Sequence, residues 1–155
     1  MNVVVGLGAN LGDRLGTLRA AVRDLRLVAR VAATSHVYET APVGPPQPHY
    51  LNAAVLLDWA GPPADLLAAL LAIEKGLGRT RGGERFGPRT IDLDVLWIDG
   101  VVVDVPGLTV PHPRLHERAF ALAPMLELVP DARDPATGEP YAVPPGDVKR
   151  LEAVV

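Results

Sequence analysis

The chain has 155 residues, 48% hydrophobic and 21% charged, a balance typical of one globular domain, which we expect to span residues 1–155. It has no cysteine, which excludes disulfides, thiolate metal sites and cysteine nucleophiles. A net charge of −3, no bilayer-length apolar run and no basic leader predict a cytoplasmic protein that binds neither nucleic acid nor membrane.

The first half of the chain reads as strands and one helix. Residues 2–8 form an apolar run that ends at glycine, as in a buried strand. Asp13 can cap a helix over residues 15–27, whose apolar side chains recur at helical spacing. Residues 28–40 are rich in β-branched side chains and predict one long strand. Residues 50–59 predict another strand, after a proline-rich loop.

The second half continues this alternation. A helix is expected within residues 61–78, a strand within 86–99, a hairpin partner over 101–105 and a short helix over 116–128. Residues 134–155 give no firm assignment. The order strand, helix, strand, strand, helix, strand predicts an α+β fold. It has a ferredoxin-like βαββαβ core, a mostly antiparallel sheet, helices packed on it, and additional short strands and helices.

One strand carries two neighbouring carboxylates. Side chains alternate along a strand, which gives one face of Asp92, Asp94, Leu96 and Ile98 and another of Ile91, Leu93, Val95 and Trp97. Carboxylates this close repel each other unless a cation lies between them. Mg²⁺ takes carboxylate oxygens and completes its shell with water and phosphate. The pair therefore predicts a magnesium site that carries a nucleotide.

Basic and aromatic side chains flank this strand. The preceding loop is rich in glycine and holds Arg79, Arg81, Arg85 and Arg89, whose guanidinium groups suit phosphate oxygens. Residues 111–120 supply further phosphate or nucleotide contacts. Tyr50 and Asn52 share a strand face and suit a flat heterocycle. His36 has no catalytic or metal-binding partner at a recognisable spacing. Ser35 and His36 do not form a catalytic pair, because the side chains of adjacent strand residues point to opposite faces.

Four segments together resemble one family, 6-hydroxymethyl-7,8-dihydropterin pyrophosphokinase of folate biosynthesis. They are GLGANLGD, YETAPVGPPQPHYLNAAV, GRTRGGERFGPRTIDLDVL and LTVPHPRLHERAF. The resemblance implies transfer of a pyrophosphoryl group from MgATP to the pterin's hydroxymethyl oxygen, with release of AMP. Two positions depart from the familiar pattern, since Ala9 replaces a serine and Phe86 replaces a tryptophan.

The resemblance also implies a role for each matching residue. The catalytic set would be Arg79, Arg81, Asp92 and Asp94, in which the two aspartates bind two Mg²⁺ ions. ATP would contact Glu74, Arg79, Arg81, Arg89, His112 and Arg118. The pterin would contact Thr40, Val43, Tyr50, Asn52 and Phe120. The expected partners are these two small molecules, bound to a monomer or a weak homodimer.

Two other readings of the sequence stay open. A magnesium-dependent phosphohydrolase could use the same carboxylates and arginines, but it would not need Tyr50, Asn52 and Phe120. A non-catalytic RNA-binding domain of the same fold would need a basic sheet face and exposed aromatic side chains. The net charge of −3 and the aromatic content of 5% favour an enzyme over an RNA binder.

Overall fold

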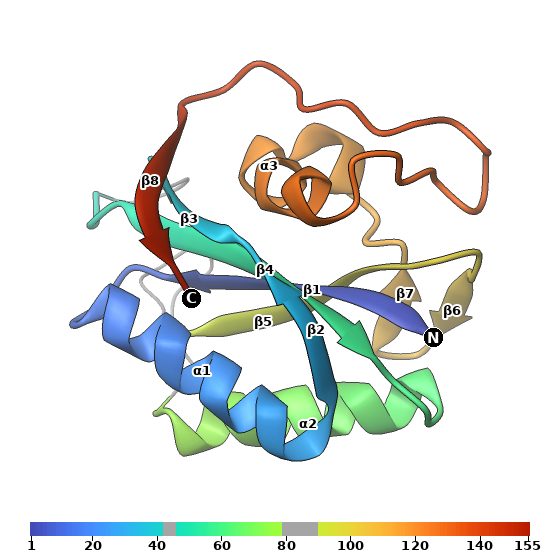
Figure 1. Cartoon of the computed structure of the whole chain (residues 1–155), viewed down its shortest axis with the longest axis horizontal. Coiled ribbons are helices and arrows are strands. Elements are labelled where there is room, and N and C mark those ends of the chain that lie inside the picture. The colour runs from blue at the N-terminus through green and yellow to red at the C-terminus, as the bar shows by residue number, and fades with distance from the viewer. Residues whose placement is uncertain (42–45, 79–89) are drawn as a thin grey trace.

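The structure is a computed structural model that describes residues 1–41, 46–78 and 90–155. Its elements are β1 (Asn2–Ala9), α1 (Arg14–Val28), β2 (Arg30–Thr34), β3 (His36–Thr40), β4 (Tyr50–Asp58), α2 (Pro63–Gly76), β5 (Asp92–Ile98), β6 (Val103–Val105), β7 (Leu108–Val110), the 3₁₀ turn η1 (Leu115–Glu117), α3 (Ala119–Leu128) and β8 (Val148–Val154). Helices lie on both sides of one central sheet (Figure 1).

The central sheet has six strands in the order β5-β1-β4-β3-β8, and β2 also pairs with β4. Every strand pair in the described ranges is antiparallel. Helices α1 and α2 cover one face, while α3 and the segment that leads to β8 cover the other (Figure 1). The predicted ferredoxin-like α+β fold is confirmed, with β1-α1-β3-β4-α2-β5 as its core.

Alternation along β1 explains how the two faces differ. Val3, Val5 and Leu7 point into the core that α1 and α2 cover. Val4 points into the second core, against α3. Gly6 and Gly8 fall on that same second face, so β1 offers no side chain to fill the space there. The second core therefore stops short of this end of the sheet.

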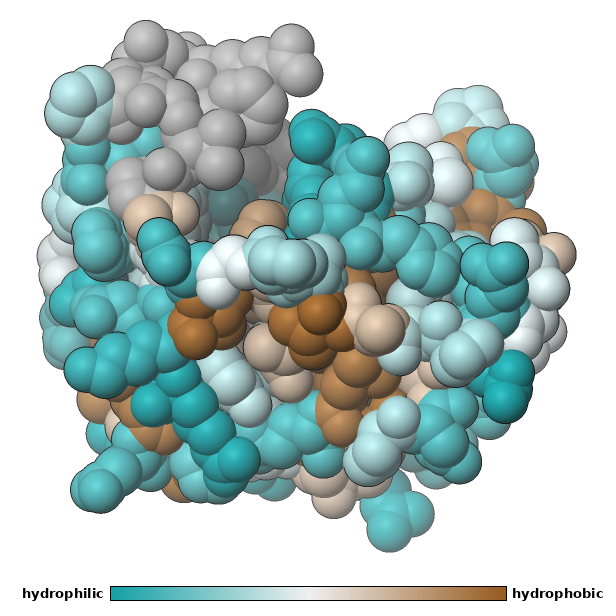
Figure 2. Space-filling view, turned by 90° about the horizontal axis from the view of Figure 1, so that it is seen from above, coloured by the Kyte–Doolittle hydropathy of each residue, from teal (hydrophilic) through white to brown (hydrophobic). Residues whose placement is uncertain are grey.

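The surface above α3 is of mixed polarity. Figure 2 looks down on α3 and the C-terminal segment, and it shows apolar side chains gathered in the middle of this face, with hydrophilic ones around them. The exposed Val143 and the half-buried Leu126 and Val129 contribute apolar surface in these elements. No helix in the described part of the chain is long and apolar enough to cross a membrane.

The predicted division of β5 into two faces is correct up to Leu96 and wrong beyond it. Val5 lies opposite Val95 and Val4 opposite Trp97, so β5 has one extra residue at this point, a β-bulge. As a result Leu96 and Trp97 both pack against α3, while Ile98 returns to the other core.

The predicted single strand over 28–40 is also wrong. Val28 ends α1, and Ser35 separates β2 from β3. The Ser35 hydroxyl accepts a hydrogen bond from the Ala54 N–H (2.8 Å) and donates one to the His36 carbonyl (2.7 Å). The Ser35 side chain therefore takes part in the hydrogen bonding between the strands in place of a backbone group. This interrupts the regular backbone pairing with β4, at the point where β2 ends and β3 begins.

Three further elements differ from expectation. The turn after β5 closes with one bridge, Ile98 to Val101, and β6 then pairs with β7 instead of β5. The helix expected over 116–128 is divided at Arg118 into η1 and α3. The unassigned C-terminal region supplies β8, which pairs with β3.

Candidate active site

A cleft of about 310 Å³ lies beside α3, over the end of the sheet where β1 carries its glycines. Strands β1, β3, β4 and β5 form its floor, and η1 and α3 form its wall. The residues that line it are Gly6, Leu7, Gly8, Thr40, Ala41, Tyr50, Asn52, Ala53, Asp92, Asp94, Leu96, Arg114, Glu117, Arg118, Phe120 and Ala121.

The two glycines let their neighbours occupy the floor. A Cβ atom at Gly8 would lie 3.0 Å from Oδ1 of Asn52 and 3.6 Å from the Tyr50 ring. A Cβ at Gly6 would lie 2.9 Å from Leu96. Real Cβ atoms rarely approach other atoms this closely, so a side chain at either position would displace Asn52 or Leu96, and glycine is favoured here by packing rather than by a turn.

Two carboxylates enter the cleft from β5. Asp92 lies directly opposite Gly8 and Asp94 directly opposite Gly6, which places both on the glycine face of the sheet. Between them the Leu93 side chain points into the opposite core. The Leu93 N–H donates to a carboxylate oxygen of Glu74 at 2.8 Å. Glu74 is only 4% exposed, so this buried carboxylate fixes the edge strand between the two aspartates.

The chemistry of the two aspartates suits a magnesium ion. Their oxygens are the hard ligands that Mg²⁺ prefers. In the described residues no three His, Cys, Asp or Glu side chains gather as a metal site. Mg²⁺ often binds through one or two carboxylates and takes its remaining ligands from water and substrate phosphates, so a pair of aspartates suffices.

The other end of the cleft combines an amide with aromatic rings. Asn52 is only 6% exposed, and its Nδ2 donates to Oγ1 of Thr40 at 2.8 Å. This bond fixes the amide plane and turns Oδ1 toward Gly8. Tyr50 contributes to the floor, and Phe120 projects from the first turn of α3. The arrangement can hold a flat ring that offers hydrogen bonds at its edge.

Arg118 brings a positive charge close to both Phe120 and Asp94. The Arg118 guanidinium carbon lies 5.5 Å from the centre of the Phe120 ring, a cation–π distance. Burial lowers the pKa of Arg118, and the nearby Asp94 partly opposes this effect. Arginine stays protonated despite such shifts, so Arg118 carries a partly desolvated charge that can meet phosphate oxygens.

Arg114 and Glu117 also line the cleft, and the sequence did not identify Glu117 as a site residue. Their side chains form an ion pair with an N–O distance of 3.1 Å, and both are largely exposed. The sequence did contain a signal for this pair, since Arg114 and Glu117 are three residues apart. A 3₁₀ turn brings residues at this spacing onto the same side.

His112 is not one of the residues that line the cleft. The backbone N–H of His112 donates to the Leu96 carbonyl (2.9 Å), and its ring Nδ1 accepts from the backbone N–H of Arg114 (3.3 Å). Burial, together with the charges of Arg118 and Arg114, lowers the pKa of His112 to about 4. The ring is therefore neutral at pH 7, with its proton on Nε2.

A second histidine anchors the turn η1. His116 Nε2 lies 2.9 Å from the Asp134 carboxylate, and its ring centre lies 4.5 Å from that of Tyr141. Burial opposes ionisation of Asp134, but the hydrogen bonds from His116 and from the backbone of Ala136 and Thr137 together outweigh it and lower the pKa of this carboxyl. The turn that presents Arg114 and Arg118 to the cleft is therefore tied to the C-terminal segment.

The structure thus brings together seven of the predicted site residues: Thr40, Tyr50, Asn52, Asp92, Asp94, Arg118 and Phe120. Glu74 and His112 lie next to the cleft without lining it, each bonded to the backbone of a cleft-forming segment. The remaining predictions lie outside the described residues, and they concern Val43, Arg79, Arg81, Arg85, Phe86 and Arg89.

Residues 4–130 match the family described as 7,8-dihydro-6-hydroxymethylpterin-pyrophosphokinase (HPPK). The chain is 44% identical over 138 residues to the 2-amino-4-hydroxy-6-hydroxymethyldihydropteridine pyrophosphokinase of Synechocystis sp., covering 88% of this chain and 70% of that protein. It is also 44% identical to the enzyme of the same name from Bacillus subtilis, over 86% of this chain and 81% of that protein.

Longer proteins match as well. The mitochondrial folate synthesis bifunctional protein of Pisum sativum is 46% identical over 87% of this chain, which spans only 26% of that protein. A crystal structure of HPPK-DHPS in complex with substrates superposes with a TM-score of 0.67 at 12% identity. That match covers 90% of this chain and 42% of the other, and at this identity it supports the fold alone.

The names of the bacterial relatives confirm the expectation of an enzyme of the pyrophosphokinase class. The chain belongs to the 7,8-dihydro-6-hydroxymethylpterin-pyrophosphokinase family, as the resemblance in its sequence implied.

Proposed function

We propose that this chain transfers a pyrophosphoryl group from ATP to the hydroxymethyl oxygen of 6-hydroxymethyl-7,8-dihydropterin, in a Mg²⁺-dependent reaction of folate biosynthesis that releases AMP. The observation that carries the proposal is a single cleft with two different ends. Asp92 and Asp94 lie on β5 at one end, Tyr50 and Asn52 lie on β4 beyond β1, and Phe120 lines the same cleft from α3. A carboxylate pair suits a metal–nucleotide complex, and the aromatic and amide groups suit a flat heterocycle.

The reaction forms one bond and breaks one. The hydroxymethyl oxygen bonds to the β-phosphorus of ATP while the bond from that phosphorus to the α–β bridging oxygen breaks. The bridging oxygen leaves with the electron pair as part of AMP. The hydroxyl proton is released to solvent, so both products are accounted for without a further reactant.

At the phosphate end the protein supplies charge and position. Asp92 and Asp94 would hold Mg²⁺, which when bound offsets the negative charge of the phosphates. Arg118 faces the same space with a partly desolvated positive charge. The predicted contacts of Arg79, Arg81, Arg89 and Glu74 with ATP, and of the neutral His112 through its Nε2–H, belong to this proposal.

At the pterin end the protein supplies shape and hydrogen bonds. Tyr50 and Phe120 would contact the pterin ring, and the Asn52 amide would bond its edge. Thr40 fixes that amide through the 2.8 Å bond to Nδ2. Holding the two reactants in one orientation is worth several orders of magnitude in rate.

General base catalysis is not needed in this proposal. Among the described residues that line the cleft there is no histidine. Phosphoryl-type transfer depends chiefly on positioning and on stabilising the charge that develops on phosphate oxygens. Two carboxylates, a partly buried arginine and a fixed amide meet those two needs.

The test is to incubate the purified protein with ATP, Mg²⁺ and 6-hydroxymethyl-7,8-dihydropterin and to resolve the nucleotides by chromatography. AMP that forms only when pterin is present would support the proposal. ADP and free phosphate that form regardless of pterin would support a phosphohydrolase instead. No turnover by a folded protein would contradict both activities.

A further inference from the structure

The position of α3 decides where the Phe120 ring stands. The helix has ten residues and begins one residue before Phe120. A helix this short is not stable on its own in water, so tertiary contacts must hold it. Pro124 weakens it further, since proline has no N–H to donate to the Phe120 carbonyl. The start of α3, at its N-cap Arg118, has no side-chain cap hydrogen bond.

Apolar packing holds α3 on the sheet. Leu122 and Met125 are fully buried against a cluster that includes Trp97 of β5. Hydrophobic burial is non-directional, so it favours contact with the sheet more strongly than any one position along it. At the N-terminal end of α3 the His116–Asp134 bond gives directional restraint, and a directional contact at the other end would further restrict the axial position of the helix.

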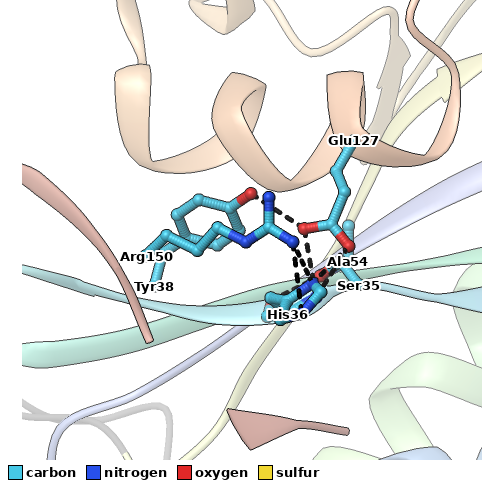
Figure 3. A network of polar contacts seen from close by, with 6 residues as sticks. All are labelled: Ser35, His36, Tyr38, Ala54, Glu127 and Arg150. Carbon is cyan, nitrogen blue, oxygen red and sulfur yellow. Dashed lines mark hydrogen bonds and ion pairs between the residues drawn. The ribbon is translucent and has the colours of Figure 1, made fainter. Parts of the chain in front are cut away.

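Glu127 provides that directional contact. It is the single charged residue of α3 and lies seven residues, about two turns, after Phe120. Its carboxylate oxygens accept from the His36 backbone N–H at 3.0 and 3.1 Å and from the Tyr38 hydroxyl at 2.8 Å. The His36 ring lies beside the same carboxylate, with Nδ1 2.9 Å from it (Figure 3).

The Glu127 carboxylate accepts each of these hydrogen bonds, because an ionised carboxylate has no proton to donate. Arg150 of β8 lies beside the same His36 ring, with a guanidinium nitrogen 2.9 Å from Nδ1 and 3.2 Å from Nε2 (Figure 3). Burial opposes ionisation of Glu127, but the hydrogen bonds from His36 and Tyr38 outweigh it and lower the pKa of this carboxyl.

The strand that holds Glu127 also leads to the cleft. His36, Tyr38 and Thr40 alternate onto the same face of β3, toward α3. Thr40 lines the cleft and bonds Asn52, which itself lies directly opposite Tyr38 in β4. The contact of Glu127 with β3 therefore joins the helix that bears Phe120 to the strands that bear Thr40 and Asn52.

We propose that Glu127 is a positioning residue for Phe120: its bonds to His36 and Tyr38 fix α3 along β3, and this sets the width of the cleft between Phe120 and Asn52. The inference rests on the proposed function only for the identity of the ligand, the pterin. Glu127 itself does not line the cleft, so it acts through the helix and not by touching substrate.

The experiment compares Glu127→Gln and Tyr38→Phe with wild type and with Glu152→Gln, which changes an exposed carboxylate on β8. We would measure the dissociation constants of the pterin and of MgATP by calorimetry. Glu127→Gln should weaken pterin binding about tenfold, which corresponds to about 1.4 kcal/mol, and Tyr38→Phe should weaken it less. MgATP binding should weaken less than pterin binding, because Arg118 at the N-cap of α3 is only one of several predicted ATP contacts.

Hydrogen exchange gives a readout that needs no ligand. The Ala121 and Leu122 amides donate to the Arg118 carbonyl in the first turn of α3, at 3.1 and 2.9 Å. They should exchange faster in Glu127→Gln and at the wild-type rate in Glu152→Gln. Unchanged exchange together with unchanged pterin affinity would overturn the inference, as would equal weakening of pterin and MgATP.

The failure of each idea can be told apart. If wild type does not bind the pterin, the proposed function fails, while faster exchange in Glu127→Gln would still support the link between Glu127 and the first turn. If Glu127→Gln does not fold, Tyr38→Phe carries the same test, because it removes one hydrogen bond and keeps the ring. Normal pterin binding by wild type and by both folded variants would reject the positioning role.

Discussion

Asn52 and Asp92 lie in one line across the sheet, each directly opposite Gly8 of β1. Adjacent strands are about 4.8 Å apart, so the two residues are separated by roughly 10 Å. The proposed pterin site and the proposed metal site are therefore two strands apart on one rigid floor. The absence of a side chain at Gly8 keeps the floor between them open.

Replacing Gly8 with alanine tests whether the floor between Asn52 and Asp92 must stay open. The new Cβ would lie 3.0 Å from Asn52 Oδ1, so the amide would have to shift by a few tenths of an ångström from the position in which Thr40 holds it. We expect the KM for the pterin to rise about tenfold with the fold retained. Gly76→Ala is the matched control, because a Cβ there meets no atom within 4 Å. Equal KM values in the two variants would contradict this role for Gly8.

Removing both carboxylates tests the metal site. In an Asp92→Ala/Asp94→Ala variant we expect kcat to fall by about 10³-fold or more, because charge stabilisation of the transition state is lost. Chelation of Mg²⁺ with EDTA should abolish wild-type turnover in the same assay. Asp104→Ala removes an exposed carboxylate of β6 and serves as the control. A preserved rate in the double variant would exclude these two residues as the metal ligands.

Glu74 is expected to matter for stability. Its buried carboxylate accepts the Leu93 N–H at 2.8 Å, and removing the acceptor leaves that donor unpaired. We predict that Glu74→Ala lowers the free energy of unfolding by about 2–3 kcal/mol, measured by urea denaturation. Glu117→Ala, at a largely exposed carboxylate, should change it much less. A loss below about 0.5 kcal/mol for Glu74→Ala would show that the bond does not hold β5.

The pKa of His112 predicts a pH effect on stability. In the folded protein this pKa is about 4, below its ordinary value of 6.5, because of burial and the nearby Arg118 and Arg114. Between these two values the unfolded chain binds more protons, so stability is fully present above 6.5 and falls as the pH drops toward 4. A His112→Asn variant should therefore lose less unfolding free energy than wild type between about pH 7 and pH 4.5. Equal losses of unfolding free energy in the two proteins, measured by urea denaturation, would contradict this prediction.

Local patterns predicted most of the fold. The strands predicted over residues 2–8 and 50–59 correspond to β1 and β4, and the capping role of Asp13 is confirmed by its 3.0 Å bond from the Gly16 N–H. The bulge in β5 could not be predicted, because one extra residue changes the pairing with β1 but not the composition of the strand. Strand β8 was missed because it lies at a solvent-exposed edge and lacks a buried face with a clear apolar alternation.

The site was predictable where the signal lies within a short segment. Asp92 with Asp94, and Tyr50 with Asn52, each share a face at a spacing of two residues, and the cleft contains all four. Contacts between distant segments gave no such signal. His36 showed no partner in the sequence, yet it lies against Glu127, 91 residues away. The role of Gly8 likewise depends on the side chains of β4.

The most direct test of the account is the mass of the pterin product after incubation with ATP and Mg²⁺. Transfer of a pyrophosphoryl group predicts that the pterin gains two phosphoryl units in one step, in equal amount to the AMP released. A gain of one phosphoryl unit with release of ADP would contradict the account, as would an unchanged pterin in the presence of folded protein.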